Sequence, residues 1–282
     1  MCGRPTLRRA KDRMKTLIQF VALFALLVLI GCGDSSDSLA RIKREGVLKW
    51  GSDPSGGAPF VFTDPKDPSK TIGFEVEIMD TFAKHLGVKH EIVRTQWDAL
   101  LDNLLSKRCD IVINGMEIND ERKKKVGFSE PYYMYEQQIT VRLEDKDKIK
   151  KIDDLKGKNV GTLSGAEANN VLKAAGFTDA QLKGHPDSLT PYDDLKFKRV
   201  DGVLQESIIA AHYAGKDAAL YNVPETFAPG RYGIAVRPED KTLLVEVDRI
   251  LKLMKENGEL AAIYKKWNIH NEKQKEVGVV AK

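Results

Sequence analysis

The sequence contains little cysteine, which excludes a fold held together by disulfides. Its 282 residues include three cysteines, Cys2, Cys32 and Cys109. The first two lie in the N-terminal segment discussed below, so Cys109 has no partner in the folded part of the chain. Cys109 precedes an expected strand, and we interpret it as a small buried hydrophobic residue rather than a nucleophile.

Excess charge of one sign is also missing from the folded part. The whole sequence carries 45 Lys and Arg against 41 Asp and Glu residues, a net charge of +4. Residues 1–31 hold six of the basic and one of the acidic residues, which leaves 39 against 40 and a net charge of −1. No basic patch with interleaved aromatic residues remains, so we do not expect nucleic acid to be a partner.

The apolar run Leu17–Ile30, broken only by Gln19, is too short for a transmembrane helix. It has about 14 residues, whereas a membrane span needs ~20. Six Lys and Arg residues precede it and Gly31-Cys32 follows it, which is the order of a signal peptide.

Leu29–Cys32 resembles the lipobox of bacterial lipoproteins. The resemblance implies that residues 1–31 are removed and that Cys32 becomes an acylated N-terminus, the chain's only attachment to the membrane. A chance cysteine after an apolar run is the alternative. Residues 32–38 are expected to form a flexible tether, since no apolar residue follows Cys32 there. Met14 offers a later start of translation.

From Leu39 to Lys282, short apolar strands alternate with amphipathic helices, and this pattern predicts an α/β fold with mostly parallel sheets. The first group of expected elements comprises strands 47–51, 90–94 and 110–113 and helices 73–87 and 96–106, the latter capped by Thr95. The second group comprises strands 159–163, 200–204 and 219–223 and helices 166–175, 192–197 and 207–214. Strand 233–236 and helices 243–255 and 259–267 complete the chain.

Two extended segments connect these groups. Gln137–Arg142 leads out of the first group, and Pro224–Tyr232, rich in Gly and Pro, leads back. We therefore expect a discontinuous first lobe of residues 39–136 and 225–282, and a second lobe of residues 137–224.

The stretch Asn114–Tyr133 reads NGMEINDERKKKVGFSEPYY and follows the expected buried strand at 110–113. Polar residues, a glycine and Arg122 directly after a strand are typical of a ligand-binding loop, although an arginine in a basic run is more often a surface residue. The order of these parts closely resembles the signature of the family 3 extracellular solute-binding proteins, the polar amino-acid receptors of ABC importers. GFEVEI at 73–78, LKGKNVG at 155–161 and GRYGIAVR at 230–237 extend the resemblance over nearly all of the chain after the leader.

The resemblance implies a two-lobed, periplasmic-binding-protein-like fold of type II, with two doubly wound mixed sheets joined by a two-segment hinge. Ligands of open α/β sheets bind beyond the carboxyl ends of the strands. The candidate ligand-binding residues at these ends are Asp53, Trp97, Asn114, Gly115, Glu117, Arg122, Ser164, Gly165, Ala166, Glu167 and Glu206.

By resemblance, Arg122 and the backbone amides of Gly165–Glu167 hold the carboxylate of the ligand. Gly115 offers a carbonyl oxygen to its ammonium group, and Glu206 is the counter-ion of that group. Asp53 and Trp97 match positions that meet the ligand side chain.

Four of these candidate residues also have an explanation that involves no ligand. Trp97 could anchor the core, Asp53 could form a turn, and Glu206 could favour a helix N-terminus. Ser164 to Glu167 has the pattern of a capping box, so the Glu167 carboxylate is not expected in the site.

The sequence departs from the family pattern in two places. Gly56-Gly57 replaces an aromatic residue, so one wall of the side-chain pocket is expected to be missing. Glu117 replaces a Thr or Ser, and a carboxylate there, beside Glu206, would raise the pKa of one of the pair unless a cation lies between them.

These observations predict an extracytoplasmic, lipid-anchored, monomeric receptor. It would capture a polar and possibly cationic amino acid and deliver it to an ABC permease on a separate chain, with no cofactor, metal or catalysis. Two alternatives stay open: an enzyme resembling cyclohexadienyl or arogenate dehydratases, which needs a general acid over the ligand, and a non-catalytic amino-acid sensor. Ala168 stands where those enzymes place the acid, and Glu167 lies one position early.

Overall fold

The computed structural model describes residues 37–55 and 57–280. The predicted signal peptide, the acylated Cys32 and nearly all of the predicted tether lie outside these residues and stay predictions. The first helix of the described residues, α2 (Ser38–Glu45), begins one residue before the expected start of the folded part. Within the described ranges, no helix combines the length and apolar composition needed to cross a bilayer.

The first sheet has five strands in the order β4-β1-β5-β12-β6. Its strands are β1 (Val47–Ser52), β4 (Lys89–Arg94), β5 (Ile111–Val112), β6 (Gly127–Phe128) and β12 (Ala235–Val236). β1 is parallel to β4 and β5, and β12 is antiparallel to β5 and β6. The helices of this part are α2, α3 (Phe74–Leu86), η1 (Trp97–Ala99), α4 (Leu100–Leu105), α5 (Asp120–Lys123), α9 (Lys241–Glu256), α10 (Glu259–Lys266) and η4 (Glu272–Val277).

Helix α3 shows why the sequence folds locally as predicted. Its residues Ile78, Met79 and Phe82 recur at helical spacing and are fully buried against the core. Gly87 ends the helix at φ 76°, a left-handed conformation that glycine adopts without strain.

The second sheet has the order β11-β7-β10-β8-β9. Its strands are β7 (Tyr133–Arg142), β8 (Val160–Leu163), β9 (Leu182–His185), β10 (Gly202–Glu206) and β11 (Leu220–Tyr232). β8 is parallel to β9 and β10, whereas β7 is antiparallel to β10 and β11. The accompanying helices are η2 (Leu143–Asp145), η3 (Ile152–Leu155), α6 (Glu167–Ala174), α7 (Thr190–Lys196) and α8 (Ser207–Tyr213).

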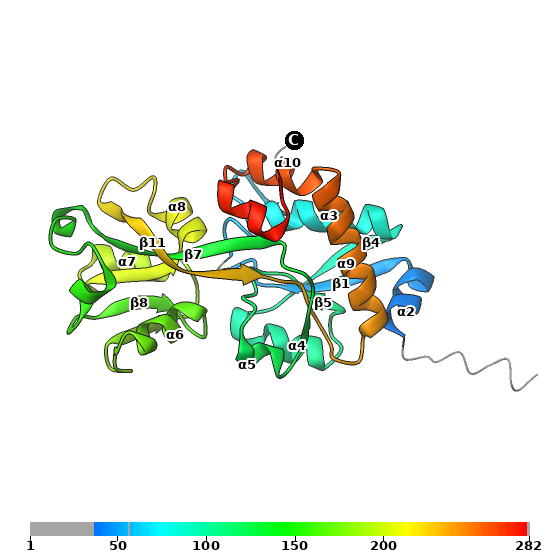
Figure 1. The fold of residues 1–282 in the computed structure, drawn as a ribbon, viewed down its shortest axis with the longest axis horizontal. Coiled ribbons are helices and arrows are strands. Elements are labelled where there is room, and N and C mark those ends of the chain that lie inside the picture. The colour runs from blue at the N-terminus through cyan, green and yellow to red at the C-terminus, as the bar shows by residue number, and fades with distance from the viewer. Residues whose placement is uncertain (1–36, 56, 281–282) are drawn as a thin grey trace, which may run out of the picture. The chain divides into compact units, whose positions relative to one another are not determined.

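Strands β7 and β11 connect the two groups of elements. They lie side by side in Figure 1, and their pairing runs from Tyr133↔Tyr232 to Arg142↔Leu220, with two register shifts. Both predicted crossings lie in these strands, and each strand begins four residues before the predicted segment and ends where that segment ends. The lobe boundaries at 136/137 and 224/225 stay a prediction, because both strands run uninterrupted through them.

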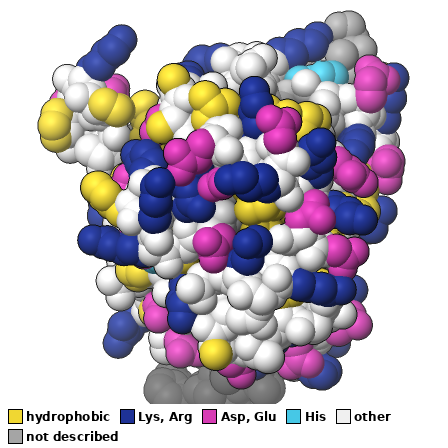
Figure 2. Space-filling view, turned by 90° about the vertical axis from the view of Figure 1, so that its left-hand side faces the viewer, with side chains coloured by type: hydrophobic (Ala, Val, Ile, Leu, Met, Phe, Trp, Pro, Cys, Tyr) yellow, Lys and Arg dark blue, Asp and Glu magenta, His cyan; other side chains and the backbone are white. Residues whose placement is uncertain are grey.

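Some local predictions are wrong. The expected helix 96–106 is split into η1 and α4, and Thr95 does not cap it: Gln96 is the N-cap, and the Thr95 hydroxyl accepts a hydrogen bond from Asn103. The sequence analysis also missed the hairpin β2 (Phe62–Asp64) and β3 (Asp67–Ile72), and strand β9. On the face shown in Figure 2, acidic and basic side chains are interspersed, in line with the near-zero net charge expected after the leader.

Candidate functional site

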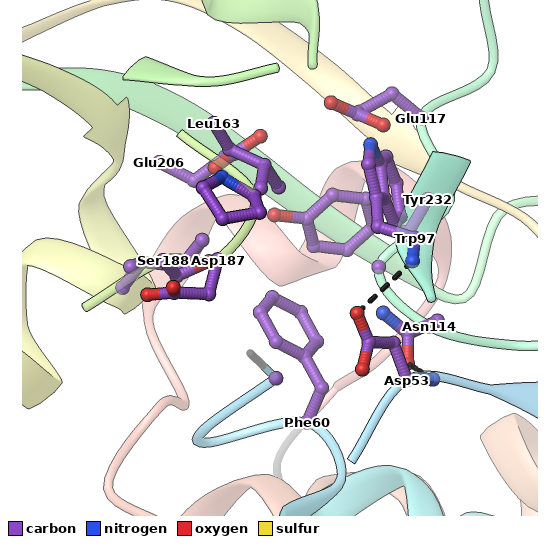
Figure 3. A pocket seen from close by; sticks show the side chains of 14 residues that line it. Asp53, Phe60, Trp97, Asn114, Glu117, Leu163, Asp187, Ser188, Glu206 and Tyr232 are labelled. Atoms are coloured by element: carbon purple, nitrogen blue, oxygen red, sulfur yellow. Dashed lines mark hydrogen bonds between the residues drawn. The ribbon is translucent and has the colours of Figure 1, made fainter. Parts of the chain in front are cut away.

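A pocket of about 390 Å³, which is partly open to solvent, lies where loops from the two sheets meet. Six predicted site residues line it: Asp53, Trp97, Asn114, Gly115, Glu117 and Glu206. Figure 3 shows the side chains that surround it. The other predicted residues, Arg122 and Ser164–Glu167, are not among the described lining residues, although Arg122 contacts Glu117 and Trp97.

Asp53 and Asn114 fix the floor of the pocket at the ends of β1 and β5. The Asn114 side-chain oxygen accepts a hydrogen bond from the Asp53 backbone N–H at 2.9 Å. The Asp53 carboxylate accepts from the backbone N–H groups of Ser55 and Trp97, both at 3.0 Å. Asp53 therefore forms the predicted turn and also faces the pocket.

Gly115 follows β5 at φ 60°, and an added Cβ would lie 2.8 Å from the Phe60 ring. Its N–H donates to a Glu75 carboxyl oxygen at 2.7 Å, and the Tyr132 hydroxyl donates to the same oxygen. Burial raises the pKa of Glu75 to about 8, so this carboxyl is neutral at pH 7. Only glycine fits here without displacing the Phe60 wall.

Glu117 and Arg122 form an ion pair at the edge of the pocket. Arg122 Nη1 donates to the Glu117 carboxylate and, at 2.9 Å, to the Glu117 backbone oxygen. Its Nη2 donates to the Gly165 carbonyl oxygen at 3.1 Å, and its guanidinium lies 5.2 Å from the centre of the Trp97 ring. Glu117 is 1% exposed, so the pair is almost fully desolvated on the carboxylate side.

The loop after β8 meets Glu117 through its backbone. The Glu167 N–H donates to Glu117 Oε1 at 2.9 Å, while the Glu167 carboxylate accepts from Asn119 and Asn170. The predicted capping box is wrong: Ala166 is the N-cap of α6 and makes no side-chain cap. The side chain of Glu167 therefore lies beside the pocket, as expected, and only its amide approaches Glu117.

Glu206 ends β10 and is 4% exposed. Burial, followed by the neighbouring charge of Glu117, raises the pKa of Glu206 to about 8. The charge of Glu117, the second of these causes, is the effect that the sequence predicted for two adjacent carboxylates. Glu206 also occupies the N-cap of α8, but its side chain makes no cap hydrogen bond.

Several lining residues were missed, chiefly Phe60, Tyr232, Asp187 and Ser188. Phe60 supplies an aromatic wall, and whether a further wall is missing at Gly56-Gly57 stays a prediction. Tyr232 ends β11 and stacks on Tyr135 at 4.6 Å between ring centres. Asp187 and Ser188 follow β9, and the rule of polar residues after strands would have found them if that strand had been recognised.

The arrangement offers hydrogen-bond acceptors for a cation, and no acidic side chain stands where the resembling dehydratases place their acid. In the described part of the chain no three His, Cys, Asp or Glu side chains are grouped as metal ligands. Ala168, at the position of the enzymes' acid, is buried and has no functional group, and Glu167 is held by two asparagines outside the pocket.

Comparisons with known proteins agree with this geometry. The family described as bacterial extracellular solute-binding proteins, family 3, matches residues 48–270. The L-cystine-binding protein TcyJ of Escherichia coli (strain K12) is 36% identical over 230 residues, which cover 81% of this chain and 85% of that protein.

Two solved structures are also similar. An ancestral arginine-binding protein bound to arginine has a TM-score of 0.73 at 36% identity, covering 79% of this chain and 98% of its own. The ancestral amino acid-binding protein AncCDT-1, described as a precursor of cyclohexadienyl dehydratase, has a TM-score of 0.75 at 33% identity, covering 82% and 99%. The chain therefore belongs to the bacterial extracellular solute-binding proteins, family 3, and has the two-lobed α/β fold of type II that its sequence predicts.

Proposed function

We propose that this protein is the substrate-binding component of an ABC importer and captures a small polar solute with a cationic group, an amino acid in the first instance. It would be a monomer, anchored through Cys32 on the extracytoplasmic side of the membrane, and would deliver its ligand to a permease on a separate chain. The observation that carries the proposal is the pocket between the two sheets, whose described lining includes four carboxylates, Asp53, Glu117, Asp187 and Glu206, and no Lys or Arg.

Charge supports a cationic ligand. Arg122 neutralises Glu117, and the three other carboxylates have no Lys or Arg in ion-pair contact within the described residues. Glu206, whose pKa is raised to about 8, becomes charged when a cation binds beside it. At an effective dielectric constant of about 20, opposite charges 4 Å apart attract by ~4 kcal/mol, which is of the order needed to desolvate an ammonium or guanidinium group. We therefore expect arginine, lysine or ornithine to bind in preference to glutamate or aspartate.

The direct test is a thermal-shift screen of the twenty amino acids and common polyamines, followed by calorimetry. A ligand at 100 times its dissociation constant adds ~2.7 kcal/mol of stability, which a thermal scan detects. Tight binding of glutamate or glutamine, without measurable heat from arginine or lysine, would refute the cationic preference.

A catalytic role is the second candidate, because one structural neighbour is named as a precursor of a dehydratase. Ala168 and the outward placement of the Glu167 side chain argue against it. Incubation with prephenate and arogenate distinguishes the two: we expect no turnover, and product formation would favour the enzyme. A sensor would share the pocket but would not stimulate uptake by a permease.

A further inference from the structure

All three oxygens of Glu117 accept hydrogen bonds inside the protein. Its backbone oxygen and Oε2 accept hydrogen bonds from Arg122, and Oε1 accepts from the Glu167 N–H at 2.9 Å. The side chain thus lies between a guanidinium group of one loop and a backbone amide of the other. This is the geometry with which a protein binds a carboxylate.

A carboxylate on the ligand would compete with Glu117 for those same donors. To take them it would have to displace a side chain that is 1% exposed and whose charge Arg122 compensates. The displaced carboxylate would then lose its partner beside Glu206, another acidic group. Removing one partner of a buried ion pair is strongly unfavourable, so the protein's own carboxylate holds the advantage.

The rest of the pocket accepts hydrogen bonds and offers no positive side chain. Asp53 and Glu206 line it, and its described lining contains no Lys or Arg. The fully buried Tyr232 hydroxyl has no hydrogen-bond partner among the described residues. Figure 3 shows this hydroxyl directed into the pocket, toward the side where Glu206 and Ser188 lie. An unpartnered buried hydroxyl beside carboxylates is free to form a hydrogen bond with a ligand group.

The polar groups lie on two sides of the pocket. In Figure 3, Asp53 lies on one side and Glu206 on the other, with the rings of Phe60 and Tyr232 between them. An apolar middle with an acceptor at each end is complementary to a methylene chain that carries a cationic group at each end.

We propose that the pocket takes a carboxylate-free organic amine, with a linear diamine as the simplest case, and that Glu117 supplies the carboxylate that Arg122 holds. The inference rests on the proposed function, capture of a small cation by this pocket, and it narrows the class of ligand. The ligand's cationic groups meet Glu206 and Asp53, and no carboxylate on the ligand is needed for binding.

Calorimetry with three matched pairs tests this on the wild-type protein. Cadaverine, putrescine and agmatine are lysine, ornithine and arginine without their carboxylates. We expect at least one amine to bind ten or more times as tightly as its amino acid. Equal or weaker binding of all three amines would overturn the inference.

Glu117→Ser gives a second test, since it frees Arg122 and the Glu167 amide for a ligand carboxylate. The preference within a pair should shift toward the amino acid by at least tenfold. The matched control is Glu121→Ser, because the Glu121 carboxylate pairs with exposed Lys124. This variant should leave both affinities unchanged. If Glu117→Ser weakens both members of a pair equally, Glu117 has only a structural role and the inference fails.

The results also separate this inference from the proposed function. If arginine, lysine or ornithine binds and the amines do not, the inference is refuted, but the proposed function as a receptor for cationic amino acids is supported. If neither member of any pair binds the wild-type protein, both fail.

Discussion

The carboxylate of Glu117 accepts a hydrogen bond from the backbone N–H of Glu167 at 2.9 Å, and so joins the loop after β5 to the loop after β8. Two further hydrogen bonds make the same connection, from Arg122 to the Gly165 carbonyl oxygen and from Asn119 to the Glu167 carboxylate. Three residues of the loop after β5, Glu117, Asn119 and Arg122, therefore make the contact between the sheets at this edge of the pocket, and one of them, Glu117, stands where the resembling family commonly has a hydroxyl residue.

Arg122 should be essential for stability as well as for the site. Arg122→Ala removes the partner of a buried carboxylate, and such a loss costs on the order of 3 kcal/mol. For a chain of this size we expect the melting temperature to fall by roughly 6–12 °C. Thermal unfolding followed by circular dichroism measures this directly.

Lys124→Ala is the matched control, because Lys124 is exposed and pairs with the exposed Glu121. It should leave the melting temperature nearly unchanged. Equally small effects at both positions would show that the Glu117–Arg122 pair contributes little to the fold.

Gly115→Ala should disturb both the fold and the pocket. The backbone at φ 60° costs a non-glycine residue about 1 kcal/mol, and a Cβ placed 2.8 Å from the Phe60 ring adds ~1–3 kcal/mol of overpacking. Because Phe60 is a wall of the pocket, ligand affinity should fall together with stability. Calorimetry and thermal unfolding of the same sample separate the two effects.

Gly87→Ala provides the comparison, since Gly87 has φ 76° but no described atom within 4 Å of the added Cβ. It should lose about 1 kcal/mol of stability and keep its ligand affinity. If both variants bind ligand like the wild type, the contact between Gly115 and Phe60 does not shape the site.

The sequence predicted strands and helices whose own residues are buried. It did not predict strands that are defined by hydrogen bonds to a neighbouring strand rather than by burial. Strand β8 (Val160–Leu163) is buried at its first three residues, and the sequence predicts it. Strand β3 reads DPSKTI and β9 reads LKGH, and neither has the alternation or apolar content that marks a strand. Both are defined by their hydrogen-bonded neighbours, which a single sequence does not show.

The same limit applies to the site. The rule of polar residues after strands found Asp53, Asn114 and Glu206 because their strands were recognised, and it missed Asp187 because β9 was not. The capping box at Ser164–Glu167 failed because Asn119, distant in sequence, binds the Glu167 carboxylate. Likewise, nothing local in the sequence indicates that Glu117 contacts both Arg122 and the Glu167 amide.

Cys32→Ser tests the predicted lipid anchor. If Cys32 is acylated, this variant should move from the membrane fraction to the soluble fraction, since stable attachment needs two or more acyl chains and the variant has none. Cys2→Ser, within the expected leader, is the control and should fractionate like the wild type. Unchanged membrane association of the Cys32 variant would refute the anchor.

Binding of a cation should strengthen as the pH rises toward 8. Burial and the charge of Glu117 raise the pKa of Glu206 to about 8, so Glu206 is mostly protonated at pH 6–7 before a cation binds. Arg122 has the opposite effect on this carboxyl, and the buried hydroxyls of Tyr135, Tyr192 and Tyr232 lie within its electrostatic reach. A cation beside Glu206 favours its charged form, and so binding releases a proton.

The sign and size of the effect follow by linkage. Below pH 8 the proton must be lost for the cation to bind, so the association constant should increase with pH, by up to tenfold per unit, and level off above about 8. Calorimetry at pH 6, 7 and 8 in buffers of different ionisation enthalpy measures both the affinity and the number of protons released. Glu206→Gln should bind the cation weakly and without this pH dependence. Glu75→Gln is the control, because it replaces another buried carboxyl whose pKa is about 8. It should retain the pH dependence, since Glu75 accepts hydrogen bonds from Gly115 and Tyr132 and does not line the pocket. An affinity that is flat from pH 6 to 8 in the wild type would show that Glu206 is not the counter-ion of the ligand.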